Sequence, residues 1–200
     1  MSAIIEFINL HGLNIIRYGL PILISSAAFT LSFIVYKQNK KRLDVTFEDS
    51  LEKIDDISTN VGLISHANGI IVCYLKVVNP SPSDIGYFDL RIFDSENPNL
   101  TLLPYTEKVL KNHTPSATSF EYETQYGYAN LNAPKSNYGI FKSNSFTRLD
   151  IAFSPEQNTK EVTITFKVAI ESRKKNPFAS DRKDFKYYSK TYIIDKTFAS

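Results

Sequence analysis

The side chains best able to perform metal or acid–base chemistry in this 200-residue chain are three histidines and two close pairs of carboxylates. A zinc site needs several His, Cys or carboxylate ligands at short spacing, and none of His11, His66 and His113 has such neighbours. The motifs of zinc proteases, redox dithiols, nucleophile elbows and phosphate-binding loops are also absent. We therefore interpret His66 and His113 as solvated loop residues.

The carboxylate pairs are Asp55–Asp56 and Glu121–Glu123. Each pair could bind a cation or act as an acid and a base, but no supporting motif accompanies either one. An enzyme would need a cleft that gathers two of the histidines with Glu121 and Glu123, and nothing in the sequence predicts that they meet. We predict that the chain is not an enzyme and that it holds no metal or cofactor.

A single cysteine, Cys73, cannot form an internal disulfide, so the fold does not depend on an oxidising compartment. Its neighbours Ile71, Leu75 and Val77 alternate with it in the pattern of a strand. Free cysteine usually behaves as a small buried hydrophobe. We expect that role for Cys73, not a catalytic one.

Two groups of basic residues are candidate contact sites. The first is a juxtamembrane linker, 37–42, with Lys37, Lys40, Lys41 and Arg42. The second is a loop that surrounds Phe178 and contains Arg173, Lys174, Lys175, Arg182 and Lys183. Cations with an apolar tip suit anionic lipid or a partner protein, and the alternative is a solvated hairpin tip. The net charge of +2 and the absence of a basic and aromatic stripe argue against nucleic-acid binding.

The segment 18–36 contains 19 residues without a charge, flanked by Tyr18 and Tyr36. About 20 apolar helical residues cross a bilayer, and tyrosines favour its interfaces. A cleaved signal peptide would have a more basic start and a small-residue cleavage site, and a buried core helix would alternate with polar positions. We predict one transmembrane helix, preceded by a short amphipathic segment at 1–17 or a frayed lead-in.

The flanking charges predict the orientation. One cation, Arg17, precedes the predicted span, and the four cations of the first basic group follow it. Positive flanks stay in the cytoplasm, so we predict the N-terminus outside and the C-terminal domain in the cytoplasm. In the opposite topology, the domain would bind envelope components, and its glycosylation patterns at Asn99 and Asn112 would face outward.

The remaining residues, 43–200, predict one soluble β domain. Hydrophobic alternation marks strands at 43–47, 85–93, 146–153, 161–170 and 185–194, and the apolar run 69–78 predicts a central strand buried on both sides. The acidic segment 50–60 is expected to be a loop or helical turn, 109–119 to be irregular, and 120–128 to be an edge strand. About seven or eight strands indicate an antiparallel immunoglobulin-like β-sandwich, with a small barrel as the alternative.

The layout of an N-terminal span, the junction KQNKKRLDV and the segment VVNPSPSDIGYFDLRIFD resembles a group of membrane proteins. These are uncharacterised single-pass, membrane-anchored β-sandwich proteins of low-GC Gram-positive bacteria and their prophages. The Asn-Pro at the strand end is also similar to the sandwich of late-embryogenesis-abundant proteins. The resemblance implies membrane localisation and no assigned chemistry.

We therefore expect a membrane-anchored β-sandwich that acts by protein–protein contact at the cytoplasmic membrane face. The expected partners are the lipid bilayer and a protein that the sequence does not identify. Edge strands and the tyrosine-rich segments 120–128 and 185–192 are the expected contact surfaces. The alternatives are an extracytoplasmic envelope-binding domain and a prophage-encoded factor for interference or exclusion at the membrane.

Overall fold

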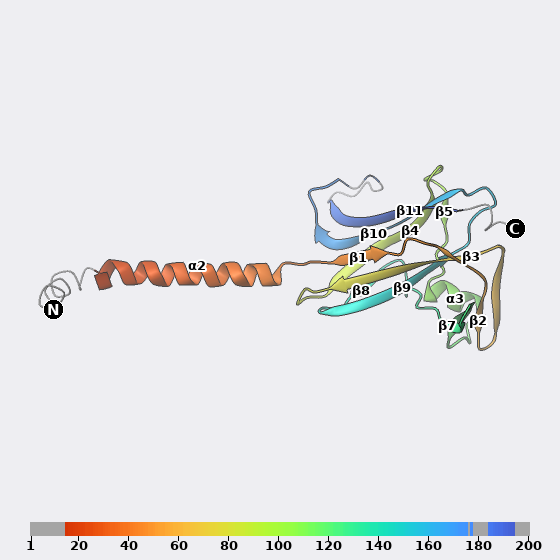
Figure 1. The fold of residues 1–200 in the computed structure, drawn as a ribbon, viewed down its shortest axis with the longest axis horizontal. Coiled ribbons are helices and arrows are strands. Elements are labelled where there is room, and N and C mark those ends of the chain that lie inside the picture. The colour runs from red at the N-terminus through yellow and green to blue at the C-terminus, as the bar shows by residue number, and fades with distance from the viewer. Residues whose placement is uncertain (1–14, 176, 178–183, 195–200) are drawn as a thin grey trace, which may run out of the picture. The chain divides into compact units, whose positions relative to one another are not determined.

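The computed structural model describes residues 15–175, 177 and 184–194, and it forms two compact units, residues 1–40 and 41–200 (Figure 1). Most of the predicted amphipathic segment 1–17 lies outside the described residues. So do three members of the second basic group, Phe178, Arg182 and Lys183.

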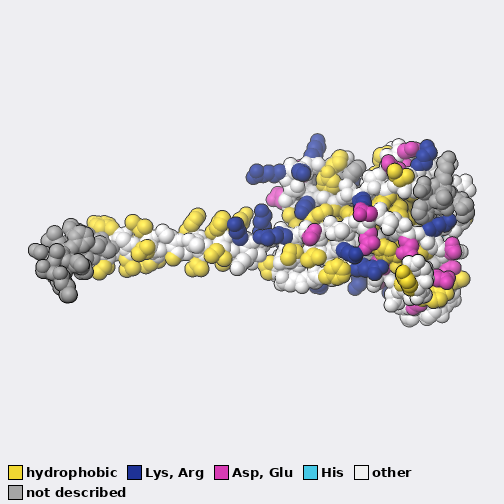
Figure 2. Space-filling model, viewed as in Figure 1, with side chains coloured by type: hydrophobic (Ala, Val, Ile, Leu, Met, Phe, Trp, Pro, Cys, Tyr) yellow, Lys and Arg dark blue, Asp and Glu magenta, His cyan; other side chains and the backbone are white. Residues whose placement is uncertain are grey.

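The first unit is helical. A short π-helical turn, η1 (Ile15–Gly19), leads into α2 (Leu20–Asn39), which has Pro21 in its first turn. No described side chain of α2 is buried, and hydrophobic side chains cover it (Figure 2). The stretch Ile16–Asn39 is long and apolar enough to cross a membrane, a property that an N-terminal signal sequence shares. This stretch contains the whole of the predicted span 18–36.

The second unit is mainly β, and its described strands form two antiparallel sheets (Figure 1). The first sheet contains β1 (Asp44–Phe47), β2 (Glu52–Thr59), β3 (Gly62–Asn79), β6 (Phe120–Thr124), β7 (Gly127–Asn130) and β9 (Ser145–Phe153). The second sheet contains β4 (Ile85–Asp94), β5 (Thr101–Leu102), β8 (Gly139–Phe141), β10 (Glu161–Glu171) and β11 (Phe185–Ile193). One short helix, α3 (Glu107–His113), lies between β5 and β6 in the chain.

The long strand β3 organises the first sheet. On one edge, its C-terminal half pairs with β1 and its N-terminal half pairs with β2, which continues the sheet to β6 and β7. On the other edge it pairs with β9 over the whole length of that strand. In the second sheet, β10 lies between β11 and β4, and the outer edge of β4 pairs with both β5 and β8.

The main hydrophobic core lies between the two sheets, and Phe166 of β10 is at its aromatic centre. Phe166 is 1% exposed, and its ring centroid lies 5.5–6.3 Å from those of Phe47, Tyr87, Phe141 and Tyr188. These four rings come from β1, β4, β8 and β11, so Phe166 packs against strands of both sheets. Such aromatic packing supplies a large share of the apolar burial that stabilises a domain of this size.

A second core covers the other face of the first sheet. Leu110 of α3 and Tyr122 of β6 are almost completely buried there, together with Ile70 and Val72 of β3. Ile71 and Cys73, which alternate with these residues in β3, point into the first core instead. Cys73 has zero exposure there. This alternation between two cores confirms the predicted burial on both sides for residues 70–73. Lys76 and Val78 are exposed, so the prediction is wrong for the end of the run 69–78, where one face of β3 is open to solvent.

The acidic segment 50–60 is a strand, β2, and the expectation of a loop or helical turn is wrong. Its two buried residues, Ile54 and Ile57, are three positions apart, which breaks the alternation of a regular strand. A register shift after Ile54 turns both side chains into the second core. Gly69 of β3 lies inside this irregularity with a φ of +74°, a conformation that favours glycine.

The segment 109–119 begins with most of α3, so the expectation that it is irregular is also wrong. The helix has only seven residues, too few to display a helical period in the sequence. The Thr106 side chain caps it by accepting the Val109 N–H at 3.3 Å, and Leu110 fixes it to the second core. The described residues contain 11 strands, more than the expected seven or eight, because 120–128 is part of a hairpin and β8 has three residues.

Candidate functional site

A groove of about 730 Å³ opens where β8 of one sheet and the start of β9 of the other meet at the side of the domain. Its lining includes residues 147–149 of β9 and residues 139–142, which contain β8. The loop 132–138 and the first turn of α3 complete the lining. The volume is within the range of about 300–1,000 Å³ that is typical of ligand sites.

The floor of the groove is aromatic. Tyr87 is 7% exposed, and its ring stacks on Phe141 with centroids 4.7 Å apart. Gly139 permits this arrangement, because a Cβ at that position would lie 2.6 Å from the Tyr87 ring. Burial, with the charge of Glu107 in addition, raises the pKa of Tyr87 to about 12. The Tyr87 hydroxyl is therefore neutral at pH 7.

The rim of the groove is cationic, with one carboxylate, Glu107, beside the side chains Lys108, Lys135, Lys142 and Arg148. Lys142 also pairs with Asp84 at 3.0 Å. The Ser143 N–H and then Lys142 lower the pKa of the Asp84 carboxyl. Asp84 offsets the charge of Lys142, and Asp150 offsets that of Arg148. The excess positive charge therefore comes from Lys108 and Lys135, and it favours an anionic ligand.

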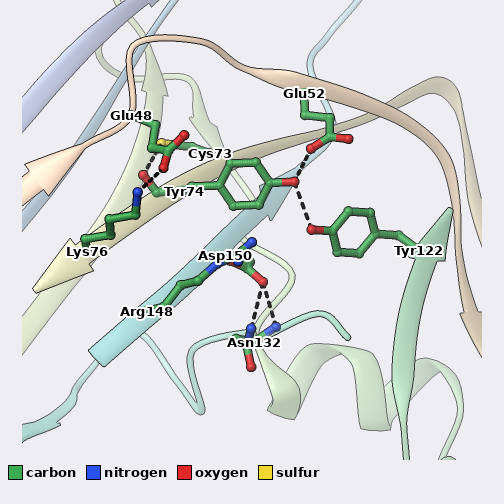
Figure 3. A network of polar contacts seen from close by, with 9 residues as sticks. All are labelled: Glu48, Glu52, Cys73, Tyr74, Lys76, Tyr122, Asn132, Arg148 and Asp150. Carbon is green, nitrogen blue, oxygen red and sulfur yellow. Dashed lines mark hydrogen bonds and ion pairs between the residues drawn. The ribbon is translucent and has the colours of Figure 1, made fainter. Parts of the chain in front are cut away.

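A buried carboxylate holds Arg148 at the rim (Figure 3). Asp150 has no exposed side-chain surface, and its Oδ1 accepts from the Arg148 Nε at 2.9 Å. Its Oδ2 accepts from the backbone N–H and the side-chain amide of Asn132 at 2.9 and 3.2 Å. The guanidinium lies 4.7 Å from the Tyr74 ring centroid. Burial opposes the charge of Arg148, but Asp150 more than compensates, and the pKa of Arg148 is raised.

The Tyr74 hydroxyl continues this network across the sheet. It donates to Glu52 of β2 and lies 2.8 Å from the Tyr122 hydroxyl of β6 (Figure 3). Burial and the hydrogen bond to Glu52 raise the pKa of Tyr74 well above its ordinary value. Tyr74 therefore remains protonated at neutral pH, and its hydroxyl contacts link three strands.

A separate cluster surrounds the one cysteine. The Cys73 Sγ lies 3.1 Å from the Tyr192 hydroxyl, which donates to the Glu48 carbonyl oxygen at 2.7 Å. Burial raises the pKa of the Cys73 thiol to about 11. Because a nucleophilic cysteine needs a lowered pKa and access to solvent, this thiol fits the predicted role as a buried hydrophobe.

The first basic group lies where α2 ends. Lys37 is in the last turn of the helix, and Lys40, Lys41 and Arg42 follow it with exposed side chains. The backbone of Arg42 is bound to the domain, because its N–H donates to the Ser81 Oγ at 2.6 Å. The Ser81 hydroxyl donates in turn to the Arg42 carbonyl oxygen at 3.0 Å.

The described part of the second basic group lies at the same end of the domain as Leu43. Tyr188 of β11 donates from its hydroxyl to the Leu43 carbonyl oxygen at 2.8 Å, and the Lys186 ammonium lies 4.7 Å from the Tyr188 ring centroid. A shallow groove of about 540 Å³ adjoins Tyr188 and is lined by Arg173 and Lys174. These side chains are exposed, and so is that of Lys175.

His66, His113 and the two carboxylate pairs do not assemble into a site within the described residues. His66 is exposed on β3, and His113 is exposed at the end of α3, so the expectation that both lie in loops is wrong. Within the described ranges, no group of three His, Cys, Asp or Glu side chains is placed to hold a metal ion. Asp55 and Asp56 lie on β2, and Glu121 and Glu123 lie on β6.

Sequence reasoning did not find the groove. Its four cations come from α3, two loops and β9, and Lys108 is 27 residues before Lys135. The available signal was the paired arrangement of Arg148 and Asp150, whose opposite charges alternate with the apolar residues of a strand. From the sequence alone, a carboxylate at position 150 fits an exposed sheet face as well as a covered one, so this signal does not locate the groove.

Comparison of the chain with models of known protein families, with curated proteins and with solved structures gives no match.

Proposed function

We propose that this protein is a membrane-anchored interaction module, with α2 as the membrane span and residues 43–200 as a domain that binds a partner protein at the cytoplasmic face. The observation that supports this most strongly is α2 itself. The helix is apolar around its circumference, its described side chains are exposed, and cations follow its last apolar turn. A helix of this kind needs an apolar solvent, which the bilayer supplies.

The strand order supports an immunoglobulin-like sandwich as the fold of the domain. The neighbours β1, β3 and β9 correspond in chain order to strands A, B and E of that fold. The neighbours β11, β10, β4 and β5 correspond to strands G, F, C and C′. In this assignment, residues 103–138 form a long connection that includes α3, β6 and β7, and their buried side chains cover the outer face of the first sheet.

The charges flanking α2 support the proposed orientation. Arg17 is the one cation before the span, whereas the four cations of the first basic group follow it. Each lysine or arginine near an anionic leaflet contributes about 1 kcal/mol. We propose that Arg173, Lys174 and Lys186 add to this attraction, because Tyr188 connects their end of the domain to Leu43.

A C-terminal topology reporter on the full chain tests the orientation. The proposal predicts activity from a reporter that folds in the cytoplasm and none from a reporter that requires export. A variant that reverses the positive bias, with Arg17 kept and two lysines added before it while Lys37, Lys40 and Lys41 are changed to Glu, should shift the signal outward. An export-dependent signal from the unmodified chain would contradict the proposal and favour an envelope-binding domain.

A further inference from the structure

Strand β9 has a half-open edge. Its pairing with β3 uses one edge, and the other edge is partly covered, since the Asp150 N–H donates to the Asn132 carbonyl oxygen at 2.9 Å. Further along, the Ala152 carbonyl oxygen accepts the Tyr105 N–H at 2.8 Å. Backbone groups of alternate residues in an antiparallel strand point the same way, so those of Phe146 and Arg148 also face away from β3.

The backbone N–H and C=O groups of Phe146 and Arg148 have no hydrogen-bond partner within the described part of the chain. Unpaired edge groups of this kind are a template for an added strand. In the immunoglobulin-like assignment, this edge of β9 is where strand D of a constant-type domain pairs with strand E. Here the chain covers that position along only half of the strand.

The groove lies along the uncovered half. Its lining includes Thr147, Arg148 and Leu149 of β9 together with Gly139 and Phe141 of β8. An extended peptide advances about 3.3 Å per residue, so four residues cover about 13 Å of strand edge. Alternate side chains of such a peptide would meet the aromatic floor or the cationic rim.

Charge selects the kind of peptide. Lys108 and Lys135 have exposed side chains with no carboxylate within ion-pair distance among the residues described, and Lys142 and Arg148 add to the positive rim. A second copy presenting the same edge would place like charges opposite each other, which is unfavourable. An acidic segment of a different protein removes that repulsion.

We propose that an extended, acidic peptide segment of a partner protein adds as a strand to the open edge of β9, with its acidic side chains at the cationic rim. This inference deepens the proposed interaction function and rests on it, by naming the site and the chemical class of the partner. The backbone hydrogen bonds supply affinity, and the side-chain contacts supply selectivity.

The test measures fluorescence polarisation with the full chain in phosphatidylcholine nanodiscs. The probe is a fluorescein-labelled octapeptide of alternating Glu and Val, and the matched probe replaces every Glu with Lys. A third probe carries N-methyl groups on alternate peptide nitrogens, which removes the donors along one edge. We expect the Glu peptide to bind and the Lys peptide to bind at least about 30-fold more weakly, because its charges repel the rim. N-methylation should weaken binding about tenfold or more.

Two pairs of protein variants separate the charge effect from the backbone effect. Lys108→Glu with Lys135→Glu should weaken the Glu peptide about tenfold or more, whereas Lys174→Glu with Lys175→Glu makes the same charge change outside the groove and should have little effect. Phe146→Pro removes one edge N–H and should weaken binding about fivefold or more, whereas Phe146→Ala keeps that donor. Circular dichroism and protection of Cys73 verify the fold of each variant.

Several results would overturn the inference. The absence of saturable binding, or equal binding of the Glu and Lys peptides, excludes charge selection. Loss of binding in the charge variant with no effect of Phe146→Pro or N-methylation indicates an anion-binding surface without strand addition. Competition by phosphatidylserine nanodiscs would assign the rim to lipid, and a dimer that Phe146→Pro dissociates would assign the edge to a second copy. If the chain binds the peptide but the topology reporter places its C-terminus outside the cytoplasm, the proposed orientation is wrong and the peptide-binding site is retained.

Discussion

Replacement of the buried carboxylate Asp150 by Ala should destabilise the domain and release Arg148 from the rim. The substitution removes three hydrogen bonds from a side chain with no exposed surface, two donated by Asn132 and one by Arg148. Breaking a buried ion pair costs about 3–5 kcal/mol. Because the Arg148 side chain is 44% exposed and can recover water, we expect a loss of about 2–4 kcal/mol.

The single thiol provides the assay. Cys73 has zero exposure in the core between the sheets, so it should react with a maleimide through openings that separate the sheets. When closing is fast, the labelling rate of the full chain in nanodiscs follows the free energy of opening. A loss of 2–4 kcal/mol then corresponds to labelling that is roughly 30- to 700-fold faster.

Asp84→Ala is the matched control for Asp150→Ala. Asp84 also accepts a backbone N–H, from Ser143 at 2.8 Å, and pairs with a cation, Lys142, but its side chain is 43% exposed. Its replacement should accelerate Cys73 labelling far less than Asp150→Ala does, because water replaces both contacts. Equal acceleration by the two substitutions would refute the argument that the Asp150 network stabilises the domain strongly because it is buried.

Three further predictions concern the core and the groove floor. Phe166→Ala should lower the free energy of unfolding by about 3–5 kcal/mol, because it opens a cavity between the two sheets. Urea unfolding followed by circular dichroism measures this loss, and a loss under about 1 kcal/mol would contradict the central position of the ring. Gly139→Ala should cost about 1–3 kcal/mol and weaken binding of the Glu peptide, because its Cβ displaces the Tyr87 ring; unchanged stability would show that the ring has another position. Burial raises the pKa of the Cys73 thiol from 9.0 to about 11, so the folded state holds this proton more tightly than the unfolded state. The stabilising contribution is complete below pH 9, and about 2–3 kcal/mol of the free energy of unfolding is lost as the pH rises from 9 to 11. Cys73→Ala should show a shallower alkaline decline, and an identical decline would contradict this assignment.

Strands with a regular hydrophobic pattern could be predicted from the sequence. The alternation over 161–170 and the apolar run over 69–78 correspond to β10 and to the C-terminal part of β3, because one or both faces of each strand are buried in a core. The turn between β3 and β4 follows from its prolines, which cannot continue a ladder. In these cases the local residue pattern was sufficient to predict the element.

Elements that depend on tertiary contacts could not be predicted locally. Strand β2 needs a register shift against β3 to bury Ile54 and Ile57, and α3 needs a core that accepts Leu110. The groove is a stronger example, since Lys108 and Arg148 reach the same rim only after the segment between β5 and β9 folds over the first sheet. The two basic groups were identified from their spacing, and their roles at a membrane stay predictions.

The retention of α2 in the lipid is the claim on which the account depends, and extraction of whole membranes with alkaline carbonate tests it most directly. The measurement combines recovery of the full chain in the membrane pellet with intact mass spectrometry of the recovered protein. We predict that the chain stays in the pellet with residues 20–39 present in its mass. Release into the supernatant, or a mass that lacks this helix, would show that the helix is a cleaved signal or a soluble element and would contradict the account.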